Sequence, residues 1–214
     1  TSFLVPEGSL AFWEDRLRGL GAVVGQRQHQ FDHEVLPFLD PDLLQLELVA
    51  HPAAADIEPW HDGPVPPVHA LRGFFGATLW ESDPGPTVDL LTRTMGFELE
   101  AEAGPRSRFR AAGAGQNGRG AAVDVVHLPA AEPGWGGAGT VHHIAWRTAD
   151  DAQQAAWRQE LTARGLHVTP VMDRQYFRSI YYREPGGVLF EIATDPPGFL
   201  RDEPLAELGS RLKL

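Results

Sequence analysis

Two stretches of this sequence carry side chains that could do chemistry. The first, Gly139–Thr148, contains His143, and the second, Glu184–Thr194, contains Glu191. Both stretches are rich in β-branched and aromatic residues that alternate with other types, which predicts strands. A neutral imidazole and a carboxylate that converge within a sheet suit a divalent metal ion that prefers nitrogen and oxygen ligands. The chain contains no cysteine, so any metal ion must be held by His and carboxylate side chains.

Strand alternation decides which histidine can act together with Glu191. Successive side chains of a strand point to opposite faces, so Val141–Thr148 places His143 on one face and His142 on the other. In Val188–Ala193, the same rule separates Glu191 from the large apolar residues of that strand. A helix must cover the apolar faces of both strands. His143 and Glu191 are therefore predicted to point together toward the concave side of the sheet.

Three further polar residues are candidates for a role beside this pair. Arg174 and Tyr181 come from the region of the third strand and could hydrogen-bond an anionic oxygen of a bound ligand. His142 suits a supporting or proton-transfer role near the start of its strand, or a structural role. The structural alternatives for the others are a surface ion-pair partner for Arg174, a core-edge aromatic for Tyr181, a hydrogen-bonded sheet histidine for His143 and a half-buried carboxylate for Glu191.

The sequence repeats itself, without gaps, at a distance of 144 residues. The shift places Trp13 on Trp157, Leu17 on Leu161, Gly21 on Gly165, Pro41 on Pro185 and Glu47 on Glu191. A shared Trp, shared turn-forming positions and a shared Glu in one register indicate two copies of one unit. Each copy reads as a strand, a helix and three further strands.

Capping and turn residues set the expected bounds of the elements. In the later copy, Asp150 or Asp151 begins a helix that Arg164-Gly165 ends. In the earlier copy, a helix over Ser9–Gly19 is capped by Ser9. The remaining strands expected in the two copies are Val35–Leu39, Leu43–Val49, Leu166–Thr169 and Tyr176–Arg183.

A third unit of similar order is predicted between the two copies. It consists of a strand over Arg72–Trp80, a helix over Pro86–Met95, and strands around Phe97–Ala101, Phe109–Ala112 and Ala121–Leu128. The stretch 113–120 contains Asn-Gly and predicts a hairpin loop. No helix follows this stretch, which argues against a phosphate-binding loop.

The expected fold class is α+β, with paired βαβββ modules that form curved mixed sheets. The expected organisation is βαβββ modules at 1–51, 70–138 and 139–194, a Pro- and Ala-rich linker at 52–69, and a C-terminal tail at 195–214. The 144-residue shift places the counterpart of His143 just before Thr1. Modules of this kind pair with one another, and three modules leave one without a partner. The sequence therefore predicts a further module upstream, so that three of four modules are present and the first strand is truncated.

The earlier copy and the middle module give no second site. Glu47 stands at the position of Glu191, but Pro37 replaces Tyr181, and the middle module has Phe75 where a histidine would be needed. Glu47 is therefore interpreted as vestigial, and the site of module 70–138 as degenerate. The other histidines lack ligand spacing and are assigned no role; they are His29, His33, His51, His61, His69, His127 and His167.

Composition narrows the classes of partner. The formal net charge of −11 argues against nucleic acid, because phosphates need a basic surface. No apolar run approaches the roughly 20 residues of a membrane span, and no signal peptide is recognisable, so a cytoplasmic location is expected. Exposed sheet edges favour a homodimer.

The pattern of His on a first strand and Glu on a last strand of βαβββ modules resembles the vicinal oxygen chelate superfamily. This superfamily includes glyoxalase I, extradiol ring-cleaving dioxygenases and antibiotic-binding resistance proteins, and the chain most resembles the hydroquinone-cleaving dioxygenases. The stretches that carry the resemblance are 3–13, 139–145, Arg174 with 176–181, 184–194, and the tail from Asp195-Pro-Pro-Gly to Asp202-Glu-Pro. The middle module matches only in pattern.

The resemblance implies four modules and a mononuclear Fe(II) ion held by two His and one Glu. His143 and Glu191 match two of these ligands, and the third belongs to the opening strand of the first module. His142, Arg174 and Tyr181 match residues that line the substrate pocket. The ligand types do not separate Fe(II) from Mn(II).

The sequence thus predicts an Fe(II)-dependent enzyme that opens the ring of a small hydroquinone- or catechol-type aromatic diol with O₂. A glyoxalase-like metal-dependent isomerase or lyase is the alternative within enzymes. A metal-free small-molecule binding protein of the resistance type is the alternative from another class.

Overall fold

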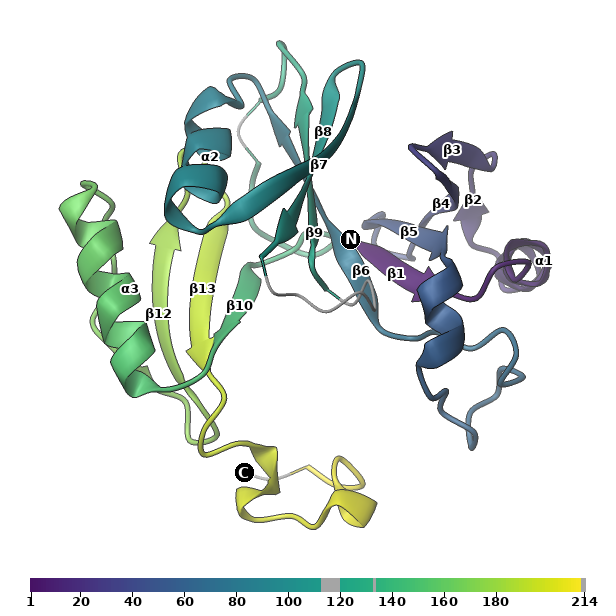
Figure 1. Cartoon of the computed structure of the whole chain (residues 1–214). Helices are drawn as coiled ribbons and strands as arrows, with labels where there is room; N and C mark the ends of the chain where they lie inside the picture. The colour runs from purple at the N-terminus through teal and green to yellow at the C-terminus, as the bar shows by residue number, and fades with distance from the viewer. Residues whose placement is uncertain (113–119, 133, 213–214) are drawn as a thin grey trace. The chain divides into compact units, whose positions relative to one another are not determined.

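The computed structural model describes residues 1–112, 120–132 and 134–212 (Figure 1). The chain divides into two compact units, Thr1–His142 and His143–Leu214, and each unit has its own sheet. Both sheets mix parallel and antiparallel strands, and helices pack beside them, so the predicted α+β class is confirmed. The loop predicted at 113–120 lies, except for Gly120, outside the described residues.

Unit 1 is built around a nine-stranded sheet with the order β2-β4-β5-β1-β6-β9-β8-β7, and β3 pairs with β4 off this path. Its first half consists of β1 (Ser2–Val5), α1 (Leu10–Gly19), β2 (Val23–Val24), β3 (Gln28–Gln30), β4 (His33–Leu39) and β5 (Gln45–Ala50). A short 3₁₀ helix follows at Pro52–Asp56. Its second half consists of β6 (Phe74–Glu81), α2 (Gly85–Asp89) with a π-helical turn at Leu90–Thr94, β7 (Phe97–Ala103), β8 (Arg106–Ala111) and β9 (Ala122–His127).

The first and last strands of each half of this sheet run parallel, and the two first strands join the halves. β1 pairs with β5 and β6 pairs with β9 in parallel, whereas β1 and β6 are antiparallel neighbours. Gly76 lies where β6 and β9 approach closely, since an added Cβ would stand 2.3 Å from the carbonyl oxygen of Ala122. A side chain at this position would therefore separate the two strands.

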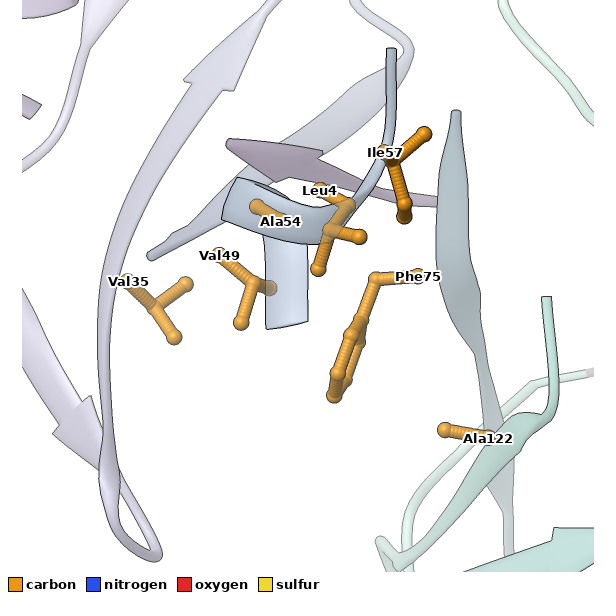
Figure 2. Packing of buried hydrophobic residues seen from close by; sticks show 7 residues of the cluster. All are labelled: Leu4, Val35, Val49, Ala54, Ile57, Phe75 and Ala122. Atoms are coloured by element: carbon orange, nitrogen blue, oxygen red, sulfur yellow. The ribbon is translucent and has the colours of Figure 1, made fainter. Parts of the chain in front are cut away.

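Both faces of the first half of the sheet are covered. On one face, Leu10 and Trp13 of α1 pack with Leu36 and Leu48, and the Trp13 indole donates a hydrogen bond of 2.8 Å to the carbonyl of His69. On the other face, a second cluster joins the two halves; it consists of Leu4, Val35, Val49, Ala54, Ile57, Phe75 and Ala122 (Figure 2). Full burial of such large apolar side chains contributes about 1.5–3 kcal/mol each.

The segment predicted as a linker is thus part of this core. Ala54 and Ile57 are buried, and the guanidinium of the buried Arg72 donates to the carbonyls of Ala54, Pro67 and Ala70. The Pro- and Ala-rich composition predicted a linker and did not show that Ala54 and Ile57 would pack into the core.

Unit 2 is a four-stranded sheet with the order β10-β13-β12-β11, packed against one helix (Figure 1). Its elements are β10 (Ile144–Thr148), α3 (Asp151–Ala163), β11 (Met172–Asp173), β12 (Arg178–Arg183) and β13 (Leu189–Thr194), followed by short 3₁₀ turns at Phe199–Arg201 and Leu205–Glu207. Asp150 caps α3 by accepting a hydrogen bond of 2.8 Å from the Gln153 N–H, as predicted.

One face of this sheet is apolar and lies under α3. Leu161 of the helix and Ile180, Tyr182, Phe190 and Ile192 of the strands are each at most 2% exposed. Burial raises the pKa of the Tyr182 phenol, which therefore stays neutral in this core. The buried amide of Gln154 ties the helix to the sheet by donating to the carbonyls of Arg178 and Ile192.

Three local predictions were wrong, each for a reason that lies outside the local sequence. β10 begins at Ile144 rather than Val141, because Ile144 pairs with Phe190 and Val141 would lie opposite Gly187, in the turn before β13. The strand expected at Leu166–Thr169 does not form. Instead, the Thr169 hydroxyl accepts from the Tyr181 N–H, and β11 forms beyond Pro170.

The third wrong prediction concerns the cap of α1. Ser9 occupies the N-cap position, but its side chain makes no capping hydrogen bond. Its hydroxyl lies 3.4 Å from the carbonyl of Val68 and contacts His69, so a tertiary contact has replaced the local one.

Two histidines lie together at the edge of the second core cluster in unit 1. The ring centroids of His33 and His51 are 4.6 Å apart, and both rings contact Phe75. His51 Nδ1 accepts a hydrogen bond of 3.1 Å from the Ala53 N–H, which caps the 3₁₀ helix of the core segment. This contact requires an unprotonated Nδ1, so it exists only while His51 is neutral.

Burial lowers the pKa of both histidines. The charges of His51 and Arg108 add to this effect at His33, and the charge of Arg110 adds to it at His51. Nearby carboxylates act in the opposite direction without reversing the shift; they are Glu7, Asp32 and Glu100. The folded state therefore favours two neutral imidazoles.

We expect unit 1 to lose stability as the pH falls below about 6.5, the ordinary pKa of His. Because the folded pKa values are lowered, the stability is complete above that pH, and below it the unfolded chain binds the extra protons. Thermal unfolding measured between pH 7.5 and 5.5 should show a falling Tm. His51→Asn keeps an acceptor for the Ala53 N–H but does not titrate, so its Tm should fall less. Equal losses in the two proteins would contradict this assignment.

Candidate active site

His143 and Glu191 meet on the face of the unit 2 sheet that α3 leaves uncovered. His143 stands immediately before β10, Glu191 lies in the middle of β13, and Ala145 pairs with Glu191 across the parallel ladder. His143 Nε2 is 2.7 Å from Glu191 Oε2. The imidazole is about one-third exposed and the carboxylate is 4% exposed, so the pair has one side in solvent and one side buried.

Two hydroxyl groups from β12 hold the other oxygen of this carboxylate. Tyr181 pairs with Glu191 across the antiparallel ladder, and its hydroxyl donates a hydrogen bond of 3.0 Å to Oε1. Ser179 Oγ also hydrogen-bonds Oε1 and is fully buried. The sequence analysis gave Ser179 no role; the signal for one was a hydroxyl residue two positions before Tyr181, and therefore on the same face of the strand.

Arg174 lies next to the same cluster, whereas His142 is a separate case. The Arg174 guanidinium stands 5.4 Å from the centre of the Tyr181 ring, and that ring meets His143 edge-on with 6.0 Å between centroids. Arg174 is exposed, so its charge faces solvent above the ring. His142 is exposed and is the last residue of unit 1. Its role stays a prediction.

The donors of this cluster fit two of the positions around a divalent metal ion. Two neighbouring ligands at about 2.1 Å from an octahedral ion stand about 3 Å apart, and the 2.7 Å between His143 Nε2 and Glu191 Oε2 is close to that value. Within the described part of the chain, no group of three His, Asp or Glu side chains could hold a metal ion. The cluster thus offers two candidate donors, and the three-ligand metal site stays a prediction.

Glu47 is the repeat counterpart of Glu191 in unit 1, and the side chains around it are arranged differently. Pro37 pairs with Glu47 as Tyr181 pairs with Glu191, so β4 and β5 obey the 144-residue shift. Both oxygens of Glu47 are occupied, since Ser2 Oγ donates to Oε2 at 2.7 Å and Gln30 Nε2 donates to Oε1 at 3.0 Å. Each oxygen of Glu47 therefore carries one of these donors, whereas both hydroxyl donors of Glu191 lie on Oε1.

A buried ion-pair network adjoins Glu47 through Gln30. Gln30 Oε1 accepts from Arg106, which also contacts Asp124, and Asp124 accepts two hydrogen bonds from Arg108 at 2.6 and 2.8 Å. Arg108 is 2% exposed and lies over the rings of Phe31 and Phe75. The charges of Arg106, Arg108 and Asp124 thus compensate one another, and the degenerate site of the middle module stays a prediction.

Comparisons with known proteins agree on a family. The model of the Glyoxalase/Bleomycin resistance protein/Dioxygenase superfamily matches residues 73–192, more than half of the chain. The chain is 44% identical to "Putative ring-cleaving dioxygenase MhqO" of Bacillus subtilis, over all of its length and 66% of that protein. It is 32% identical to a chlorohydroquinone/hydroquinone 1,2-dioxygenase of Sphingobium indicum, over all of its length and 66% of that protein.

A solved structure extends the likeness to three dimensions. A crystal structure titled as a "putative dioxygenase" from Bacillus subtilis matches with a TM-score of 0.88 and 43% identity, over all of this chain and 67% of that one. The chain therefore spans about two thirds of the length of these relatives. No helix in the described part of the sequence is long and apolar enough to cross a membrane.

We expect Asp124→Ala to destabilise unit 1 by about 3–5 kcal/mol, because it leaves the buried Arg108 charge without its partner. Hydrogen exchange of the amides of β8 and β9 measures this loss. The control is Glu100→Ala, which removes a surface partner of Arg110 and should cost about 1 kcal/mol or less. Similar losses from the two variants would contradict a structural role for the buried network.

Proposed function

The chain belongs to the Glyoxalase/Bleomycin resistance protein/Dioxygenase superfamily, and we propose that it acts as a ring-cleaving dioxygenase on a hydroquinone- or catechol-type aromatic diol. The observation that carries the proposal is the cluster in unit 2, in which His143 and Glu191 lie 2.7 Å apart beside Tyr181 and Arg174. Two relatives that are 39% and 44% identical over 99–100% of this chain are named "Putative ring-cleaving dioxygenase", and one that is 32% identical is named a chlorohydroquinone/hydroquinone 1,2-dioxygenase.

We propose Fe(II) as the metal ion, with Mn(II) as the alternative of the same ligand preference. Imidazole Nε2 of His143 and Oε2 of Glu191 are two of its ligands. A third ligand must come from outside the cluster. About one third of each relative's length lies outside its match to this chain, and β10 ends the order of its sheet. A further βαβββ module that pairs along β10, as β6 pairs along β1, would bring its own first strand beside His143.

When bound, the metal ion supplies the Lewis acidity and the redox chemistry that O₂ needs to react with an aromatic diol. In the overall reaction, the ring bond next to a hydroxyl-bearing carbon breaks and both oxygen atoms of O₂ enter the product. The residues of this chain bind the diol, orient it and handle its protons.

Arg174 and Tyr181 are assigned different parts of the substrate. Arg174 keeps its positive charge at any relevant pH and its guanidinium is exposed beside the Tyr181 ring, so it suits an anionic substrate oxygen. The single proton of Tyr181 is donated to Glu191. Its oxygen still has acceptor capacity, which suits a substrate hydroxyl that keeps its proton. His142 is proposed as the group that moves a proton to or from the bound diol.

A cytoplasmic location and a homodimer formed through a sheet edge belong to the same proposal. Light scattering on the purified protein gives the oligomeric state directly. A monomer at micromolar concentration would remove the dimer from the proposal without affecting the active site.

We expect His143→Ala and Glu191→Ala to abolish O₂ uptake with hydroquinones and catechols after anaerobic loading with Fe(II). Each substitution removes one of the two ligands that the chain contributes. The matched control is Glu47→Gln, which alters the equivalent carboxylate of unit 1 and should leave O₂ uptake unchanged. An oxygen electrode and product analysis provide the measurement.

Three outcomes would point away from a dioxygenase. O₂ uptake that survives either alanine substitution would place the chemistry elsewhere. Metal-dependent isomerisation or elimination without O₂ consumption would favour the glyoxalase-like alternative. Tight binding of an aromatic ligand by the metal-free protein, unchanged in both variants, would favour a binding protein.

A further inference from the structure

Ser179 is a polar residue at a position where the fold itself favours a hydrocarbon. It lies in β12 opposite Ala193 and has no exposed surface. The repeat counterpart is Val35, which is equally buried, lies opposite Val49 and packs in the core cluster of unit 1. Since Val satisfies the packing at this point of the sheet, the hydroxyl of Ser179 calls for another explanation.

The hydroxyl of Ser179 has one carboxylate partner, Oε1 of Glu191. A buried hydroxyl without a partner is costly, and so is a buried carboxylate oxygen. Tyr181 donates to the same oxygen at 3.0 Å. An ionised carboxylate oxygen offers two lone-pair sites, so two hydroxyl donors saturate Oε1.

The two oxygens of Glu191 are thereby made unequal. Oε1 takes both hydroxyl donors, whereas Oε2 faces His143 Nε2 at 2.7 Å. Two donors on one oxygen also fix the rotation of the carboxylate group about its terminal bond. In the copy that has Val35 and Pro37 instead of the two hydroxyl residues, Glu47 has one donor on each oxygen.

We propose that Ser179 is a positioning residue, whose hydroxyl joins that of Tyr181 on Oε1 of Glu191 and leaves Oε2 as the single oxygen available to a metal ion. The inference rests on the proposed metal site and adds the element that selects its ligand atom. Without the Ser179 hydroxyl, the carboxylate turns more freely and Oε1 competes for the same place. Loss of a hydrogen bond that orients a ligand lowers metal affinity by about 10–100-fold.

Metal affinity of the full polypeptide tests the proposal. Mn(II) and Fe(II) are titrated anaerobically against a competing chelator, and Tm of the metal-free protein is measured in parallel. Ser179→Ala should raise both dissociation constants about 10–100-fold. Ser179→Thr, which keeps the hydroxyl, should restore most of the affinity. Ser179→Cys keeps the size of the side chain but offers a weak donor, and it should resemble Ser179→Ala even if the alanine variant folds poorly.

Ser2→Ala is the matched control, because Ser2 is a buried serine that donates to Glu47, the repeat counterpart of Glu191. It should lower Tm by an amount similar to Ser179→Ala and leave the metal dissociation constants unchanged. The positioning role alone would be overturned if the Ser179→Ala and Ser179→Cys proteins are folded and bind metal as tightly as the unaltered protein. Unaltered protein that is folded and binds neither metal would overturn the proposed metal site, and the positioning role with it.

Discussion

The arrangement of unit 2 depends on how one buried carboxylate is satisfied. Glu191 is almost completely withdrawn from solvent, and a buried charge is costly unless hydrogen bonds and an opposite charge or metal compensate it. The antiparallel register of β12 and β13 supplies two hydroxyl donors, and the parallel register of β10 and β13 supplies the imidazole. A slip of either strand by one residue would turn these groups to the other face and leave the carboxylate uncompensated.

The same arrangement of strands surrounds its central glutamate with different side chains in unit 1. Its strands keep the repeat register, but Val35 and Pro37 replace the two hydroxyl residues, and Glu47 has one donor on each oxygen. An arginine–aspartate network is linked to Glu47 through Gln30. Buried polar groups are therefore compensated in both units. In unit 1 they pair with one another, whereas in unit 2 Oε2 of Glu191 faces the partly exposed His143.

Because side chains alternate along each strand, the core residues and the candidate-site residues of unit 2 lie on opposite faces of its sheet. Ile180 and Tyr182 are buried under α3, while Ser179 and Tyr181 face the candidate site, and the same division holds for Phe190 and Glu191. One helix therefore stabilises the strands from one side without entering the site. Arg174 and His143 keep exposed surface, which leaves the cluster open to a ligand.

The sequence by itself determined the α+β class and the 144-residue register that links Glu47 to Glu191. These are local or periodic properties, because the period of a strand and the apolar face of a helix are set by neighbouring residues. Only the tertiary structure decided that β10 begins at Ile144, that Ala54 and Ile57 enter the core, and that Ser179 shares Oε1 of Glu191 with Tyr181. Those features depend on pairing between segments far apart in the chain, where register and packing override local preference.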